Sequence, residues 1–423
     1  MMKLKYHSMA PFLFILMIWC MSSTFAQNPE QVFPQSFNVE VKNPLQYERQ
    51  EVMIFLPEEA LLKQATSFNP EAFVVMAGEA EIPSQYITEP GRAGLAFVLD
   101  QLKAKETKKL NIRYAEEGVV KRDYPKRTQA EVSHKTGGYF KDNKYIGGEF
   151  QNVDSLRVPD EHTDHSYYIR YEGPGWESDK VGYRYYLDWR NGIDVFGKKT
   201  DEMVLQQVGL DGFDSYHEMQ PWGMDILKVG KALGVGSIAL FHNGQANRID
   251  DTDSIITVIT ENGPVYSSVK TNYYGWNVNQ QELDVQSLLS IHAGSRLTHN
   301  RLEVKGSPEN LSTGLTKDPS TKLHQSKGSE KAFGYLATYG PQSLNKDNVG
   351  LAVLFRPKDF IGFTEDEYSH VVKLKPNQGK LDYYFLAAWE LEKEGIRNEQ
   401  EFMEYLNKKA MELARPVEVS TTK

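Results

Sequence analysis

The sequence contains a single cysteine, Cys20, and it lies within the first 26 residues. Disulfide bonds therefore cannot stabilise the chain beyond this segment. Cys20 would suggest a lipoprotein, but the bulky Trp19 before it disfavours lipid attachment. Past residue 26, no run approaches the roughly 18 consecutive apolar residues that a membrane-spanning helix requires. We therefore expect no membrane insertion.

The chain is also poor in positive charge, with 48 lysine and arginine residues against 57 aspartate and glutamate residues and a net charge of −9. A nucleic-acid binder would need a clustered basic surface, so we exclude nucleic acid as a partner. An anionic sugar remains compatible, because a few arginines can create a locally positive site. The sequence also lacks a glycine-rich phosphate loop, a nucleophile elbow and a dinucleotide fingerprint, and we expect no cofactor.

Residues 1–26 have the features of a secretory signal peptide. Lys3 and Lys5 form a basic start, residues 11–19 are apolar, and Ala26 ends a cleavage motif of small residues. We therefore expect cleavage near Ala26 and a periplasmic or secreted protein.

The rest of the chain is rich in residues that favour strands, including many of its 23 tyrosines and 20 phenylalanines. In residues 27–118, apolar and polar residues alternate over short runs, as around Phe37, Val39 and Val41. Short strands at this spacing predict a small immunoglobulin-like β-sandwich. Residues 119–148 are basic and then glycine-rich, which predicts a linker and a loop that lies over the next domain.

Residues 149–423 contain long strand-like runs such as residues 254–260, with no helical period. They predict a large antiparallel, supersandwich-like β-sandwich that serves as the catalytic domain. Near its end, Asn398 should cap a helix, with Glu401 placed to reach back to the cap. Residues 416–423 are expected to be loose. The fold class is therefore mostly β, with two sandwiches and a C-terminal helix.

The densest group of polar side chains lies in residues 183–190, which read YRYYLDWR. On a strand, alternate residues face opposite sides, so the tyrosine at 183 and Trp189 would share an apolar face. The opposite face would carry Arg184, Tyr186, Asp188 and Arg190. Arginine binds a carboxylate or a sulfate through two parallel hydrogen bonds. The alternative is a solvated face on which Asp188 simply pairs with the arginines.

Two flanking segments supply aromatic and charged residues that suit a sugar site. The turn in residues 171–182 (YEGPGWESDKVG) would present Trp176 and Glu177 outward, although a tryptophan that plugs the sandwich is the alternative. Residues 215–230 (SYHEMQPWGMDILKVG) cannot form a regular helix because proline and glycine interrupt them. The substrate-binding candidates are Trp176, Glu177, Tyr186, Asp188, Lys198, Trp222, Asp225, Lys228 and His134.

His217 and Tyr216 are the candidates for proton transfer. Histidine titrates near neutral pH, although a lone histidine is more often structural. His162 and His165 could join the site, but on a strand their three-residue spacing would point them apart, so no metal site is predicted there. An acidic surface turn is the simpler interpretation of the one calcium candidate, formed by Asp250, Asp251 and Asp253.

Two long, ordered motifs, EGPGWESDKVGYRYYLDWRNGIDVFGKK (172–199) and YHEMQPWGMDILKVGKALGVG (216–236), resemble an exported bacterial family long described as a domain of unknown function. Genes of this family occur in polysaccharide-utilisation clusters, including those for ulvan and pectin-like polymers. The resemblance covers most of the chain after the first domain. One activity in the family is dehydration of ulvan oligosaccharides, which converts a saturated uronic acid at the non-reducing end into a 4,5-unsaturated residue.

The resemblance implies three chemical requirements. A base must remove the C5 proton, an acid must protonate the departing C4 hydroxyl, and a cation must stabilise the carboxylate. We assign His217 and Tyr216 as base and acid in either order. The carboxylate clamp would be formed by Arg184 and Arg190. Sugar stacking and sulfate neutralisation are expected from Trp176, Trp222, Lys198 and Lys228.

Two other functions remain open from the residues. A polysaccharide lyase would use nearly the same groups to expel a sugar instead of water. A non-catalytic carbohydrate-binding protein would need only the tryptophans and arginines. An anionic, uronic-acid-containing and sometimes sulfated oligosaccharide is the expected partner in all three cases, and no oligomeric state is predicted.

Overall fold

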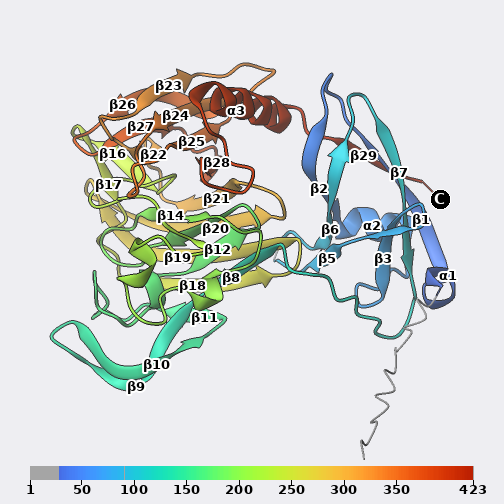
Figure 1. The fold of residues 1–423 in the computed structure, drawn as a ribbon, viewed down its shortest axis with the longest axis horizontal. Helices are drawn as coiled ribbons and strands as arrows, with labels where there is room; N and C mark the ends of the chain where they lie inside the picture. Colours follow the sequence, from blue (N-terminus) through green and yellow to red (C-terminus); the bar gives the residue numbers. More distant parts are fainter. Residues whose placement is uncertain (1–27, 90, 423) are drawn as a thin grey trace, which may run out of the picture.

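Two β-sandwiches of unequal size lie side by side in the computed structural model, which describes residues 28–89 and 91–422 (Figure 1). The signal peptide expected in residues 1–26 lies outside these ranges. The predicted fold class, mostly β with antiparallel sheets and a C-terminal helix, is confirmed. No helix within the described ranges is long and apolar enough to span a bilayer.

The smaller sandwich consists of two sheets around an apolar core, with the strand orders β29-β1-β7-β3-β4 and β2-β6-β5. Phe37, Val39 and Val41 of β1 are buried in that core, as the alternation in the sequence predicts. The elements up to residue 114 are α1 (Pro29–Val32), β1 (Gln35–Lys42), β2 (Arg49–Pro57), α2 (Glu58–Gln64), β3 (Phe73–Ala77), β4 (Ala80–Ile82), β5 (Ser84–Ile87), β6 (Gly94–Leu102) and β7 (Thr107–Tyr114).

The end of the chain returns to the smaller sandwich. β29 (Glu418–Thr422) pairs antiparallel with β1, so that Glu418 lies opposite Lys42 and Thr422 opposite Asn38. The expectation of a loose tail is therefore wrong for the described residues. Without β29, β1 would expose an unpaired edge, and pairing satisfies its backbone groups.

The larger sandwich packs a nine-stranded sheet against two five-stranded sheets. The nine-stranded sheet has the order β11-β18-β19-β20-β21-β28-β25-β24-β23. Its strands are β11 (Ser155–Arg157), β18 (Ser254–Asn262), β19 (Tyr266–Val278), β20 (Gln281–His292), β21 (Leu297–Lys305), β23 (Lys322–Ser326), β24 (Gly334–Gly340), β25 (Val349–Phe355) and β28 (Lys380–Trp389).

The two five-stranded sheets share the opposite layer. One has the order β15-β14-β13-β12-β8, and we call it the site sheet; the other has the order β17-β16-β22-β27-β26. The strands are β8 (Thr128–Glu131), β12 (Gly175–Ser178), β13 (Val181–Tyr185), β14 (Ile193–Lys198), β15 (Gly223–Asp225), β16 (Ala239–His242), β17 (Gln245–Arg248), β22 (Leu311–Thr316), β26 (Phe360–Glu365) and β27 (Ser369–Leu374).

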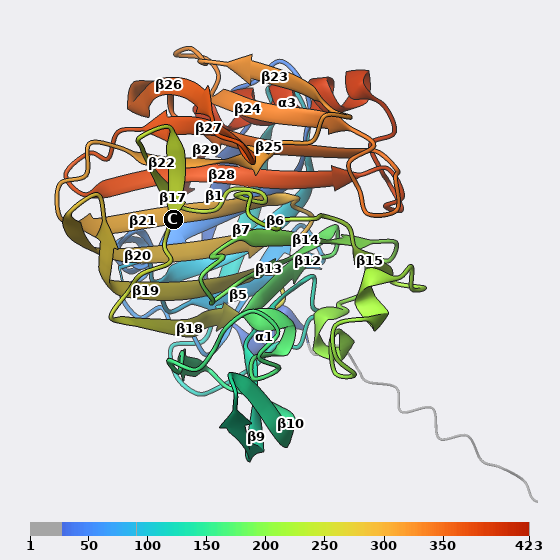
Figure 2. The same ribbon diagram turned by 90° about the vertical axis from the view of Figure 1, so that its left-hand side faces the viewer.

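Residues 119–148, expected to be a linker and a loop, contain regular strands. β8 is an edge strand of the site sheet, and β9 (Ser133–Lys141) pairs with β10 (Lys144–Asn152) in a hairpin that projects from the larger sandwich (Figures 1 and 2). Asp142 and Asn143 at its tip both have positive φ, which is the conformation that a two-residue hairpin turn requires. These turn residues were the signal for a hairpin in the sequence.

Helix α3 (Glu399–Ala414) packs on the outer face of the nine-stranded sheet. The Asn398 side chain accepts a hydrogen bond from the Glu401 backbone, and Glu401 reaches back to the cap, as predicted. Phe402 is fully buried against β24 and β25. Gly350 makes room for its ring, because a Cβ there would lie 2.3 Å from a Phe402 ring atom.

We expect Phe402→Ala to destabilise the protein by about 3–5 kcal/mol, because it removes a buried aromatic ring and leaves a cavity. Urea unfolding measures this loss. The matched control is Lys408→Ala, an exposed position on the same helix, which should change stability by less than about 0.5 kcal/mol. Equal effects of the two substitutions would contradict the packing described for α3.

Candidate active site

The outer face of the site sheet carries the charged groups that the sequence places on one side of residues 183–190. Tyr183 and Tyr185 point inward, and the Tyr183 ring stacks on Trp176 at 5.6 Å. Arg184 lies between them on the other face. The predicted alternation therefore holds for β13 and ends with it, because the strand stops at Tyr185.

Arg184 is the centre of a buried charge network. Its guanidinium donates to Asp194 (Nη2–Oδ2, 2.7 Å), to the Tyr216 hydroxyl (2.8 Å) and to the Tyr186 hydroxyl (3.0 Å), and it also contacts Asp225. Burial, together with the neighbouring Asp225 carboxylate, raises the pKa of Asp194 to about 7. Each guanidinium nitrogen is bonded inside the protein and the side chain is buried, so Arg184 holds its neighbours in place and is not available as the substrate clamp that the sequence suggested.

Arg190 is saturated in a similar way by a second group of carboxylates. Its guanidinium lies 2.5 Å from Asp188, 2.8 Å from Glu172 and 3.0 Å from Asp164, and it stacks over the Tyr186 ring at 4.0 Å. Tyr186 therefore joins the Arg184 and Arg190 networks. The alternative of a solvated face is therefore correct for the pairing of Asp188 with Arg190 but not for the solvation, because Asp188 is buried. With its guanidinium held by three protein carboxylates, Arg190 does not support the predicted role as a substrate clamp.

His217 lies at the edge of the Arg184 network. It ends the short helix η3 (Ser215–His217), its side chain is 42% exposed, and its Nε2 lies 3.4 Å from Asp225 Oδ2. The hydrogen bond that His217 donates to Asp225 raises the pKa of His217, although partial burial opposes it. Tyr216 is buried and its hydroxyl faces Arg184, so it cannot exchange protons with a bound sugar as the sequence suggested.

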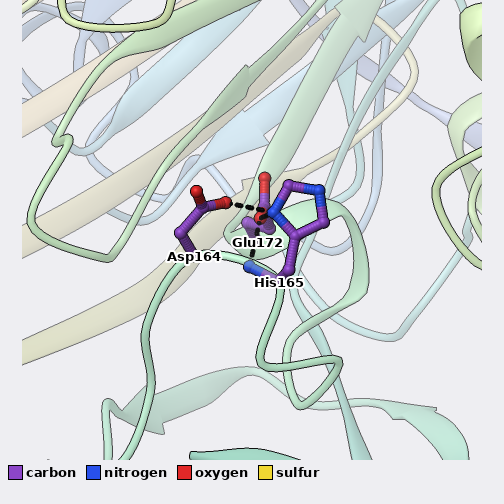
Figure 3. Close-up of side chains that lie close together, drawn as sticks. All are labelled: Asp164, His165 and Glu172. Atoms are coloured by element: carbon purple, nitrogen blue, oxygen red, sulfur yellow. Dashed lines mark hydrogen bonds and ion pairs between the residues drawn. The ribbon is translucent and has the colours of Figure 1, made fainter.

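His165 is a second exposed imidazole, in a segment for which the sequence predicts no metal site. Its segment is a turn and not a strand, so the three-residue spacing does not point it away from the site. Its Nδ1 lies 2.5 Å from Asp164 Oδ1, while the other ring nitrogen points away from both carboxylates (Figure 3). The side chain is 57% exposed. Nδ1–H donates to Asp164, which leaves Nε2 free to accept a proton.

Phe213 connects the two exposed histidines. The His165 and Phe213 rings are 5.0 Å apart; Phe213 also packs on Tyr216 at 6.4 Å, and the Tyr216 ring lies 4.7 Å from that of His217. Tyr167, also exposed, packs on the same phenylalanine at 4.9 Å. Two imidazoles and a tyrosine therefore border one surface beside the buried charges.

Backbone strain concentrates at this surface. Non-glycine residues rarely adopt positive φ, and each such residue costs on the order of 1–3 kcal/mol unless its surroundings impose the conformation. Five residues in or directly beneath the site have φ between 37° and 72°: His165, Tyr167, Tyr171, Glu172 and Asn191. Strain of this kind clusters at functional sites.

Asp164, His165 and Glu172 also form the one group of three metal-ligating side chains found within residues 28–89 and 91–422 (Figure 3). Arg190 already bonds to both carboxylates and supplies positive charge there. A metal ion would have to displace that guanidinium. The carboxylates of Asp250, Asp251 and Asp253 are not brought together in such a group, so the structure gives no support to the calcium candidate.

Several residues predicted to contact the substrate are buried or lie away from the surface that His165 and His217 border. Trp176 is buried and donates to Thr298, and Glu177 and Lys198 form a fully buried ion pair at 2.6 Å, so none of these three contacts a substrate. Asp225 is buried beneath His217. His134 stacks on Tyr168 at the base of the β9–β10 hairpin. Trp222 is half-buried against Phe196, and Lys228 is exposed.

Arg248 and Trp189 were missed as site residues. Trp189 was placed on the apolar face, but it is 43% exposed, and the Arg248 guanidinium lies over its ring at 5.5 Å. Arg248 Nη1 is buried without a hydrogen-bond partner among the described residues. Burial lowers the pKa of Arg248, and Asp188 and Arg190 are among the charges that act on it, so it borders the Arg190 network. Only tertiary structure brings β17 to this position.

A cavity of about 570 Å³ lies away from these residues, between the smaller sandwich, α3 and the nine-stranded sheet. We place the candidate active site on the site sheet. There, exposed proton-transfer groups, buried charges and strained backbone coincide.

The fold and this site define a two-sandwich β protein with two exposed imidazoles held over buried carboxylates. The chain belongs to the family described as a domain of unknown function, DUF4861, which matches residues 41–419. A relative, the uncharacterized protein P7 of Formosa agariphila, is 24% identical over 277 residues, covering 58% of this chain and 66% of P7. The chain thus spans just under two thirds of that relative.

Two solved structures from Enterococcus faecalis, a protein in glycosyl hydrolase family 38 and an alpha-mannosidase, are similar at 10% identity and a TM-score of 0.46. The similarity covers 93% of this chain but only 48% and 46% of those chains. Similarity at this level carries no information about activity.

We expect Asp225→Asn to lower the pKa of the His217 imidazole toward its ordinary value of 6.5, because the hydrogen bond that raises it is lost. NMR titration of the histidine ring protons measures this change. Glu404→Gln, at an exposed carboxylate on α3 on the opposite side of the sandwich, is the control and should leave the titration unchanged. An unaltered His217 titration in Asp225→Asn would show that Asp225 does not hold this imidazole.

Proposed function

We propose that the protein is an oligosaccharide dehydratase that removes water from the non-reducing-end uronic acid of ulvan-type chains. The observation that carries this proposal is the Asp164–His165 pair, an exposed imidazole whose tautomer is fixed by a carboxylate, with a second imidazole beside it. The resemblance of the motifs around residues 172–199 and 216–236 to the family that includes this activity supports the same reaction.

The base in this proposal is His165. Its Nε2 takes the C5 proton of the uronate, and Asp164 stabilises the imidazolium that forms. The electron pair left at C5 forms the C4–C5 double bond as the C4–O bond breaks. The fixed Nδ1–H···Oδ1 contact orients the ring without consuming the nitrogen that meets the substrate.

The acid is His217. The hydrogen bond to Asp225 raises the pKa of His217 and so favours its protonated form, which can give a proton to the departing C4 hydroxyl, which leaves as water. The ring must rotate away from Asp225 to reach the substrate, and its partial exposure leaves space for this motion. Proton uptake at His165 and release at His217 balance over one turnover.

Arg248 replaces Arg184 and Arg190 as the proposed carboxylate clamp. The guanidinium groups of Arg184 and Arg190 are paired with carboxylates, whereas no carboxylate among the described residues lies within ion-pair distance of the Arg248 guanidinium. Negative charge that develops on the uronate as C5 is deprotonated would be stabilised there. Trp189 beneath it offers an exposed aromatic face for a sugar ring.

Purified protein incubated with the oligosaccharides that ulvan lyases and hydrolases release should yield a product lighter by one water, with no change in chain length. Mass spectrometry separates the three functions that the sequence left open. Shorter products would identify a lyase. Oligosaccharides that bind but return unchanged would identify a binding protein, and either outcome would refute the dehydratase.

We expect His165→Ala to lower kcat/KM by about a hundredfold to ten-thousandfold, the range of general acid–base catalysis. The ultraviolet absorbance of the conjugated uronate follows the rate. His134→Ala is the matched control, because this histidine lies on the hairpin and not beside Phe213, and it should retain turnover close to wild type. Similar rates for the two variants would remove His165 from the mechanism.

A further inference from the structure

The cavity between the two sandwiches has the size and chemistry of a second binding site. It encloses about 570 Å³, within the range of small-molecule pockets. Its lining includes β2 of the smaller sandwich, the end of β20 with the start of β21, and helix α3. In Figure 1, α3 lies at the top of the larger sandwich with one end toward the smaller sandwich, and β2 lies on the side of the smaller sandwich that faces the larger one.

Positive charge in the lining is not fully neutralised. Each lining carboxylate has a basic partner within 4.0 Å: Glu51 and Asp100 contact Arg127, Glu394 contacts Lys180, and Glu412 contacts Lys409. Arg49, by contrast, donates only to the backbone oxygens of residues 412 and 415. Among the described residues, no carboxylate lies within ion-pair distance of its guanidinium. Its Nε is also buried without a partner.

The rest of the lining suits a ring that carries hydroxyl groups. His299 and Tyr384 stack at 4.2 Å with nearly parallel rings, and Arg92 lies 4.9 Å over the Tyr266 ring. Glu51 Oε2 is buried without a hydrogen-bond donor, although Oε1 binds Arg127. Flat aromatic surface, an acceptor for hydroxyl groups and an uncompensated guanidinium are what an acidic sugar requires.

We propose that this interdomain cavity binds an anionic sugar residue, with its carboxylate or sulfate on Arg49 and its ring against the His299–Tyr384 pair. The ligand class follows from the lining and does not rest on dehydration at the site sheet. A cavity built from both sandwiches and α3 would couple the smaller domain to substrate binding. It would hold a second part of the same polymer, or a second oligosaccharide.

Isothermal titration calorimetry with a uronic-acid oligosaccharide tests this site in the His165→Ala protein, in which turnover is suppressed. We expect two binding equivalents. Adding Arg49→Gln should remove one of them or weaken it at least tenfold, whereas Arg397→Gln, at an exposed arginine before α3, should leave both. A carboxyl-reduced oligosaccharide and free sulfate separate recognition of the uronate from recognition of any anion.

One equivalent in both the His165→Ala protein and its Arg49→Gln derivative would overturn the proposal, as would full retention of both in Arg49→Gln. If Arg49→Gln fails to fold, Tyr384→Leu takes its place, because it removes the ring against which the sugar is proposed to lie and should weaken the same equivalent. Arg49→Gln in the otherwise unchanged protein should still dehydrate the shortest substrate. If no protein tested, including the unmodified one, dehydrates the substrate, the proposed function is refuted. The number of binding equivalents still tests the proposal that the cavity binds an anionic sugar.

Discussion

The site depends on two buried arginines, each held by several carboxylates. Arg184 ties β13 to Asp194 on β14 and Asp225 on β15, and Arg190, in the loop between β13 and β14, ties that loop to Glu172 and Asp164. Removing one partner from a buried pair costs about 3–5 kcal/mol, because it leaves an uncompensated charge in a poor solvent for ions. These pairs therefore fix the loops that carry His165 and His217 against the sheet.

Because the two arginine networks use most of the charged side chains of the site as internal supports, few of these side chains are exposed. Tyr186 joins the two networks through its hydroxyl on one side and its ring on the other. The strained backbone at His165, Tyr167 and Glu172 persists because these ion pairs and the packing on Phe213 over-determine it. The sequence motifs around residues 172–199 are dense in charge chiefly because they build this support.

The spacing of apolar residues along the chain correctly predicted the features that depend on local backbone geometry. The two sandwiches, the face alternation of β1 and β13 and the capped helix α3 follow from spacing along the chain. The alternation of apolar and polar residues could not show which polar residues are buried. Arg184 and Lys198 have the charge of surface residues, and only the carboxylates on neighbouring strands make their burial possible. The role of His165 also depends on contacts that the sequence does not show. A strand would point His162 and His165 apart, but this segment is a turn, which Arg190 holds through Asp164 and Phe213 holds through the His165 ring.

Proton abstraction by His165 is the central step of this account. The most direct measurement compares turnover of ordinary substrate with that of substrate deuterated at C5 of the terminal uronate. A several-fold slower reaction of the deuterated substrate, with one water lost per molecule, is the predicted result. Product formation at equal rates, with deuterium retained at C5, would contradict the account.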